Sequence, residues 1–168
     1  MKIIHTQYNH INDVMKIINQ AKSYFKNNNI NQWQDGYPNE ESIKEDIIQN
    51  KSYVLIDNGK VIGTMFFAIE NDPSYSYIEN GQWLTDNKYA VIHRIAVDEN
   101  IKGRNIAFEL VNYVIDQCKL NTINSIRIDT HKDNLSMQRF LTKHDFKACG
   151  TIYLASGDPR IAFEKLLA

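Results

Sequence analysis

The sequence has few cysteines, few prolines, almost no net charge and no long apolar run. Its two cysteines, Cys118 and Cys149, are too few and too far apart for a disulfide framework or a zinc site. The net charge of −1 gives no reason to expect a nucleic-acid partner. No segment approaches the roughly 18 apolar residues of a membrane span, and the start MKIIHTQYNH has no apolar signal region. We therefore expect a cytoplasmic protein with reduced thiols, no metal and no membrane partner.

What remains is the composition of an ordinary globular protein. Of the 168 residues, 43% are hydrophobic and 23% are charged. This length suits one domain with a sizeable core, and neither an internal repeat nor a linker divides it. We expect residues 1–168 to form a single domain.

Apolar residues recur at helical spacing in two N-terminal segments. Residues 11–25 form the first, with Asn12 able to cap it. Residues 40–49 form the second, after Asn39 as a cap and with an acidic first turn. Asn58-Gly59 then separates two apolar runs, which predicts a β-hairpin.

Strands and helices alternate in the second half. Strands over 89–97 and 125–130 with a helix between them require a parallel pair and a right-handed crossover. A short helix from 134 and two C-terminal strands follow. Residues 71–88 form a long, turn-rich loop of the kind that is usually functional or mobile. The pattern predicts a mixed α/β sheet, whose ligands favour the carboxyl ends of the parallel strands.

A glycine–cation segment opens the helix of that strand–helix–strand unit. It reads Lys102-Gly103-Arg104-Asn105-Ile106-Ala107. Helix N-termini present unpaired N–H groups and bind phosphates, while glycine permits a close backbone approach. The alternative is a solvated loop that simply leads into a helix.

In this context the segment resembles the phosphate-binding turn of the GNAT superfamily of acetyl-CoA-dependent N-acetyltransferases, Arg/Gln-x-x-Gly-x-Gly/Ala. A second GNAT motif, Asn-x-x-Ala-x-x-Leu-Tyr-x-Lys-x-Gly-Phe, matches at Asn134, Lys143 and Phe146. The stretches NQWQDGYPNEE, HRIAV and DPRIAFEKL are similar to a bacterial subgroup whose substrates are generally unassigned. The resemblance implies a mixed, mostly antiparallel twisted sheet of six to seven strands. It also implies about four helices on both faces and a splayed parallel strand pair.

The resemblance further implies where coenzyme A would bind. Its pyrophosphate would sit on the N–H groups of Lys102, Gly103, Arg104, Asn105, Ile106 and Ala107. Its pantetheine arm would pair with the backbone of Ile95, Ala96 and Val97, as an extended ligand adds to a strand edge. The coenzyme set is completed by Asn134, which is equally well explained as a helix N-cap, and by Phe140 and Lys143.

Two departures from the motif bear on this binding. Asn105 stands where the motif has Gly, although Asn tolerates unusual backbone angles better than most residues. Lys102 keeps the charge of the usual Arg but loses its bidentate geometry. We expect binding to persist in weaker form.

The usual catalytic acid of the family is missing, because Leu141 stands at the position of its Tyr. His93 is a candidate base, with a structural histidine as the alternative. Tyr153 is a candidate acid, with a packed aromatic as the alternative. Arg94 and Asp129 are expected to form a buried pair across the parallel strands. Cys149 is better explained as a small buried thiol than as an acyl carrier.

Aromatic and acidic residues gather in the two segments expected to roof the acceptor site. A cationic amine would suit such a surface through cation–π contacts and charge pairing. Simple packing of a lid explains these residues equally well. Arg160 offers a different option, a contact with an acceptor carboxylate. The residues chosen for the acceptor site are Trp33, Tyr37, Glu70 and Tyr77; Asp72, Tyr75, Glu79 and Trp83 lie alongside.

Three functions follow from these patterns. The first is acetyl transfer from acetyl-CoA to a primary amine of a small molecule or peptide by direct attack, with no metal. The second is a non-catalytic acyl-CoA-binding module, favoured by Leu141 and Asn105. The third is a protein-interaction domain that uses residues 71–88 without any coenzyme. The family resemblance also makes a homodimer plausible.

Overall fold

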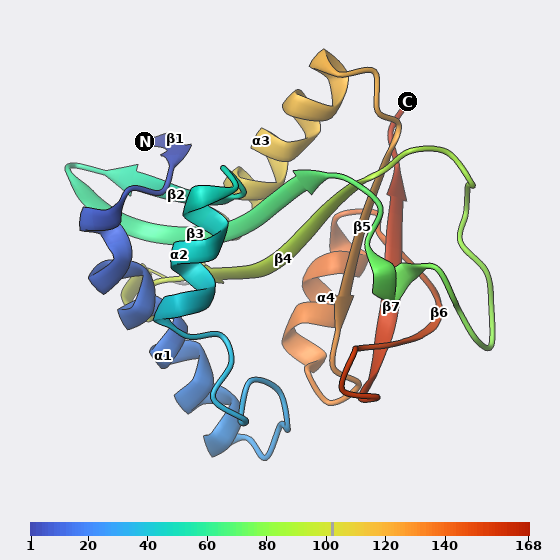
Figure 1. Cartoon of the computed structure of the whole chain (residues 1–168), viewed down its shortest axis with the longest axis horizontal. Helices are drawn as coiled ribbons and strands as arrows, with labels where there is room; N and C mark the ends of the chain where they lie inside the picture. The colour runs from blue at the N-terminus through green and yellow to red at the C-terminus, as the bar shows by residue number, and fades with distance from the viewer. Residues whose placement is uncertain (102) are drawn as a thin grey trace. The chain divides into compact units, whose positions relative to one another are not determined.

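The computed structural model describes residues 1–101 and 103–168 (Figure 1). The helices and strands, in chain order, are β1 (Lys2–His5), α1 (Ile11–Asn27), α2 (Glu40–Ile48), β2 (Ser52–Asp57), β3 (Lys60–Ile69), β4 (Ala90–Val97), α3 (Ile106–Leu120), β5 (Ser125–Thr130), α4 (Leu135–Lys143), β6 (Lys147–Tyr153) and β7 (Pro159–Leu166).

The strands form one seven-stranded sheet in the order β1-β2-β3-β4-β5-β7-β6. β1, β2 and β3 pair in antiparallel fashion, as do β5, β7 and β6, whereas β4 and β5 are parallel. This confirms the predicted mixed, mostly antiparallel sheet with one parallel pair. The described chain divides into two compact units: residues 1–67 with 93–114, and residues 68–92 with 115–168.

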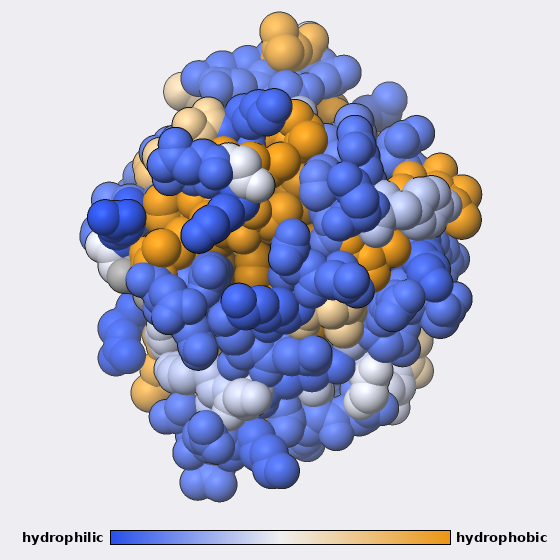
Figure 2. Space-filling model, turned by 90° about the vertical axis from the view of Figure 1, so that its left-hand side faces the viewer, coloured by the Kyte–Doolittle hydropathy of each residue, from blue (hydrophilic) through white to orange (hydrophobic). Residues whose placement is uncertain are grey.

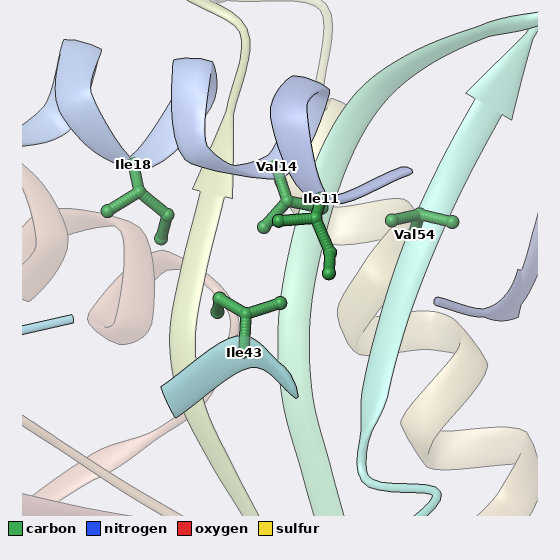
Figure 3. Close-up of a cluster of buried hydrophobic side chains, with 5 residues drawn as sticks. All are labelled: Ile11, Val14, Ile18, Ile43 and Val54. Atoms are coloured by element: carbon green, nitrogen blue, oxygen red, sulfur yellow. The ribbon is translucent and has the colours of Figure 1, made fainter. Parts of the chain in front are cut away.

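One core cluster of the first unit lies between α1, α2 and β2. Figure 3 shows Ile11, Val14 and Ile18 of α1 facing Ile43 of α2, with Val54 of β2 beside them, and all five side chains are buried. Successive strand residues point to opposite faces, so Leu55 lies on the other face from Val54. A β-carbon at Gly63, which pairs with Leu55, would lie 3.3 Å from Leu110 of α3. Helices therefore cover both faces here, as predicted.

Local signals account for most of the boundaries in this unit. The Asn39 side chain accepts a hydrogen bond from the Ser42 N–H and caps α2, as predicted. Asn58 and Gly59 both adopt positive φ in the hairpin turn, which such turns require. The prediction for the α1 cap was wrong. A 3-10 turn over Tyr8–His10 leads directly into the helix, so its N-cap is His10 and Asn12 lies inside.

The second unit is built on β5, β7 and β6 in continuous antiparallel register, with α4 packed against β6. A buried ion pair crosses its centre. Arg127 Nε donates to Glu164 Oε1 at 3.2 Å, and these two residues are register partners on β5 and β7. The Ser125 hydroxyl and the Leu84 N–H also donate to the Glu164 carboxylate, so this buried charge has several hydrogen bonds.

Polar residues cover most of the face shown in Figure 2, where hydrophobic residues are visible chiefly in one recess between polar side chains. None of the described helices is long and apolar enough to span a membrane.

Candidate functional site

Strand β4 leaves its parallel partner early. Register pairs join Ala90 to Ile126 and Val91 to Arg127, and none follows along β4. Arg94 then adopts a φ of +52°, a left-handed conformation that is uncommon for a residue other than glycine. The parallel pair is therefore splayed, as predicted. Such a strand keeps backbone groups available to an extended ligand.

The Arg94 side chain is held by two partners from its own unit. Its guanidinium forms an ion pair with Asp46 of α2, and Nη1 donates to the Tyr37 hydroxyl at 3.0 Å. Burial raises the pKa of the Asp46 carboxyl, more than the charge of Arg94 lowers it. The prediction of an Arg94–Asp129 pair was wrong. Asp129 accepts a hydrogen bond from the Tyr75 hydroxyl instead.

Sequence reasoning did not identify Asp46, although a signal was present. Asp46 lies three residues after the buried Ile43 on α2, and i and i+3 share one helix face. An acid on the buried face of a helix needs a cation. Arg94, the fifth residue of β4, supplies this cation.

His93, the candidate base, is half-buried on β4. Its ring centroid lies 5.4 Å from that of Phe66. Two residues further on, Ile95 is buried, while Ala96 and Val97 are partly exposed. The three residues predicted to bind pantetheine thus follow directly after Arg94, the residue with positive φ.

Two residues of the turn before α3 adopt a left-handed backbone conformation. Gly103 and Asn105 adopt φ values of +89° and +57°, so Asn105 accepts the left-handed conformation as predicted. The Asn105 carbonyl receives the N–H groups of Phe108 and Glu109, while the first N–H groups of a helix have no partner within it. Ile106 and Ala107 begin α3, and Arg104 is exposed beside them. The prediction for Lys102 lies outside the described residues.

Asn134 caps α4 in the second unit. Its Oδ1 accepts the Met137 N–H at 3.2 Å and the residue is 4% exposed, so the N-cap interpretation is confirmed. Phe140 packs edge-on against His144, and Lys143 is exposed at the end of the helix. Leu141, at the position of the usual Tyr, is fully buried and acts in packing.

One buried hydroxyl has no partner. Among the described residues, Thr130 Oγ1 is the only buried side-chain oxygen or nitrogen that lacks a hydrogen bond. Thr130 ends β5, and ligands favour the carboxyl ends of parallel strands in such sheets. A buried hydroxyl without a partner at this edge of the sheet suits a polar ligand.

Tyr153, the candidate acid, belongs to a cluster with Tyr77 and Glu79. The Tyr153 hydroxyl donates to Glu79 Oε2, and the Tyr77 hydroxyl donates to Oε1 at 3.3 Å. The hydrogen bond to Glu79 raises the pKa of Tyr153, so the phenol keeps its proton. Backbone bonds between Glu79 and Thr151 place this cluster along β6.

The loop over residues 71–88 is anchored to the sheet. The Arg127 guanidinium lies 4.0 Å from the ring centroids of Trp83 and Tyr89, and its Nη2 donates to the Thr85 carbonyl. The Trp83 indole N–H donates to the Tyr75 carbonyl, and Tyr75 is buried. Two of the predicted roof aromatics, Tyr75 and Trp83, therefore pack the loop onto its own unit.

The four residues predicted to contact the acceptor are divided between the units. Trp33 packs edge-on against Phe25, with ring centroids 5.4 Å apart, and Tyr37 is exposed beneath the Arg94 guanidinium. Both belong to the first unit. Glu70 and Tyr77 are exposed in the second unit.

The thiols and the remaining histidines have ordinary environments. Cys118 and Cys149 are buried and reduced, and burial raises the pKa of the Cys118 thiol to about 11. A raised pKa makes both thiols poor nucleophiles. His131 and His144 are half-buried, and burial lowers their pKa. In the described part of the chain, no group of three or more His, Cys, Asp or Glu side chains could hold a metal ion.

Comparison with known proteins identifies this arrangement. The profile of the acetyltransferase (GNAT) family matches residues 13–146. A GNAT-family acetyltransferase from Streptococcus agalactiae 2603 is 30% identical, with a TM-score of 0.90 over 99% of this chain and 95% of that one. A putative acetyltransferase from Staphylococcus aureus Mu50 is 26% identical, with a TM-score of 0.75 over the whole of both chains.

A more distant structure shows only the shared fold. The PaiA N-acetyltransferase of Thermoplasma acidophilum, solved in complex with coenzyme A, is 13% identical, with a TM-score of 0.73 over 98% of both chains. No curated protein sequence matches this chain significantly.

Proposed function

The chain belongs to the GNAT acetyltransferase family, and we propose that it transfers the acetyl group of acetyl-CoA to a primary amine of a small molecule or peptide. Transfer proceeds by direct attack of the amine on the thioester within a ternary complex. No metal takes part.

The start of α3 is the observation that carries this proposal. Positive φ at Gly103 and Asn105 turns the backbone into the helix, where unpaired N–H groups and partial positive charge suit the coenzyme pyrophosphate. Exposed Arg104 adds counter-charge, as does the cation of Lys102 in the sequence. Ile106 and Ala107 supply the first helical N–H groups.

The rest of the coenzyme set extends this site. The pantetheine arm pairs with the backbone of Ile95, Ala96 and Val97, which follow Arg94 on β4. Asn134 contacts the coenzyme near the bend of its arm while it caps α4. Phe140 and Lys143, on the same helix, complete the set.

Proton transfer falls to His93 and Tyr153, because the buried Leu141 offers no hydroxyl. His93 accepts a proton from the acceptor ammonium, directly or through water. The neutral nitrogen attacks the thioester carbonyl, the C–S bond breaks, and Tyr153 protonates the departing thiolate. The extra proton on the new amide nitrogen passes through solvent to the Tyr153 phenolate, which restores the phenol.

The acceptor amine lies against the aromatic and acidic residues. Exposed Tyr37 and Tyr77 offer ring faces, and Glu70 offers a carboxylate. Trp33 presents part of its ring near Phe25. Rings and carboxylates together favour a cationic amine through cation–π contacts and charge pairing.

The test follows free thiol while acetyl-CoA is incubated with a panel of amines. We expect turnover with at least one amine class. His93→Gln and Tyr153→Phe should each lower kcat by about 10²-fold while acetyl-CoA affinity stays unchanged. Acetyl-CoA binding by calorimetry without any turnover would favour a non-catalytic acyl-CoA-binding module, the alternative that the loss of Tyr at Leu141 suggests. An absence of acetyl-CoA binding would contradict both.

A further inference from the structure

Three arginines are buried in the described chain, and two of them have a carboxylate partner. Arg94 pairs with Asp46 and Arg127 pairs with Glu164. Arg160 is 8% exposed, yet within residues 1–101 and 103–168 no carboxylate oxygen lies within 4.0 Å of its nitrogens. Its one hydrogen bond runs from Nη1 to the Pro159 carbonyl at 2.9 Å. A guanidinium without a counter-ion in the described chain keeps N–H groups that an anion from outside the chain can accept.

Arg160 lies on the face of β7 that the 71–88 loop covers. Residues 160 and 164 are four apart on the strand and therefore point to the same face. On that face Glu164 accepts the Leu84 N–H of the loop. β7 runs antiparallel to β5 and pairs Ile161 with Thr130, so Arg160 lies beside the carboxyl end of β5.

The guanidinium is accessible and its charge is not neutralised. Of the described side chains, only that of Thr130 has a buried polar atom without a hydrogen bond, so Nε and Nη2 of Arg160 reach solvent. The charge of Arg160 also acts on His131, where it adds to burial in lowering the pKa of the imidazole. An incoming anion therefore finds two free N–H directions.

We propose that Arg160 binds the carboxylate of the acceptor, which makes the acceptor an amine that also carries a carboxylate, such as an amino acid or peptide. This inference rests on the proposed acetyltransferase function. A guanidinium fork matches a carboxylate through two parallel N–H···O bonds, which a lysine cannot reproduce. The loop that covers this face also carries exposed Tyr77, one of the residues assigned to the acceptor.

The kinetic test compares amino acids and dipeptides with their carboxamides as acceptors. Wild type is expected to favour the free carboxylates by about 10-fold to 100-fold in kcat/KM. Arg160→Gln should remove that preference through a higher KM and leave turnover of the amides unchanged. Arg160→Lys should recover only part of it. Equal use of acids and amides by wild type, or an equal loss of both in Arg160→Gln, would overturn the proposal.

A binding test separates this site from the catalytic proposal. N-acetylated amino acids and their amides, the products of the reaction, are titrated by calorimetry into wild type and Arg160→Gln. Carboxylate-dependent binding that disappears in the variant supports the site even if no acceptor turns over. Turnover that is indifferent to the carboxylate leaves the acetyltransferase standing and removes the Arg160 assignment. If no N-acetylated acid binds wild type, the assignment fails as well.

Two controls exclude a phosphate partner and misfolding. The affinities of coenzyme A and 3′-dephospho-coenzyme A should not change in Arg160→Gln. A loss confined to coenzyme A would instead assign Arg160 to its phosphate and overturn the proposal. Arg160→Gln removes an unpaired charge and should keep the wild-type Tm, whereas Arg127→Gln breaks an ion pair and should lower it. A Tm loss in Arg160→Gln as large as in Arg127→Gln would show that the guanidinium is structural and contradict the proposal.

Discussion

Arg94, the β4 residue with positive φ, forms an ion pair with Asp46 of α2, and both side chains are largely buried. The same guanidinium donates to Tyr37 in the segment between α1 and α2. One cation thus holds the strand of the proposed coenzyme site and a residue of the proposed acceptor surface.

Replacing Asp46 should therefore lower the free energy of unfolding far more than replacing its neighbour Glu45. Asp46→Ala leaves the Arg94 charge buried and unpaired, and the free energy of unfolding should fall by about 3–5 kcal/mol. Glu45→Ala changes an exposed residue, and its effect should stay within about 0.5 kcal/mol. Urea unfolding measures both. Similar effects of the two substitutions would show that the Arg94–Asp46 ion pair does not stabilise the fold.

Gly81→Ala should displace the 71–88 loop from β6. A β-carbon at residue 81 would lie 1.8 Å from the carbonyl oxygen of Cys149, a contact that backbone atoms cannot relieve cheaply. The expected loss is about 3 kcal/mol of unfolding free energy, with a shift in Trp83 fluorescence. Gln82→Ala is the matched control at an exposed neighbour. A Gly81→Ala protein with the stability of that control would contradict the close backbone approach.

The buried Cys118 thiol should make the protein less stable in alkali. Its pKa rises from 9.0 to about 11 on folding, so the unfolded chain loses this proton first. The protonated thiol makes its full contribution to the free energy of unfolding below pH 9. About 2 kcal/mol of this contribution is lost as the pH rises from about 9 to about 11. Denaturant unfolding over this range should show a shallower pH dependence in Cys118→Ala. If wild type and Cys118→Ala lost stability in parallel over this pH range, the loss could not be assigned to the Cys118 thiol.

Asn105 should tolerate glycine and reject valine. Glycine adopts a φ of +57° without strain and restores the family motif, so Asn105→Gly should bind acetyl-CoA at least as tightly as wild type. A β-branched residue in this conformation costs about 1–2 kcal/mol, so Asn105→Val should bind about 10-fold more weakly. Calorimetric titration measures both variants. Tighter binding by the valine variant would refute the assigned geometry of the turn.

Much of the fold was predictable because its signals are local. Helical periodicity located α1 and α2 to within about two residues at their ends, and the Asn39 side chain marked where α2 begins. The Asn58-Gly59 pair identified the β2–β3 hairpin. The strand–helix–strand order required the parallel pairing of β4 and β5.

The partners of buried charges were not predictable, because they depend on residues distant in sequence. Arg94 pairs across 48 residues and Arg127 across 37. The predicted parallel pairing of the two strands suggested Asp129 as the partner of Arg94, whereas the positive φ of Arg94 was not visible in the sequence. The anchoring of the 71–88 loop depends likewise on Glu164, 80 residues from Leu84.

Amide hydrogen exchange with and without acetyl-CoA tests the central claim most directly. If the start of α3 and the free edge of β4 hold the coenzyme, acetyl-CoA should slow exchange at residues 103–107 and 95–97, with little change at β1 and β2. Unchanged exchange at residues 103–107 under saturating acetyl-CoA, or protection confined to other elements, would contradict the account.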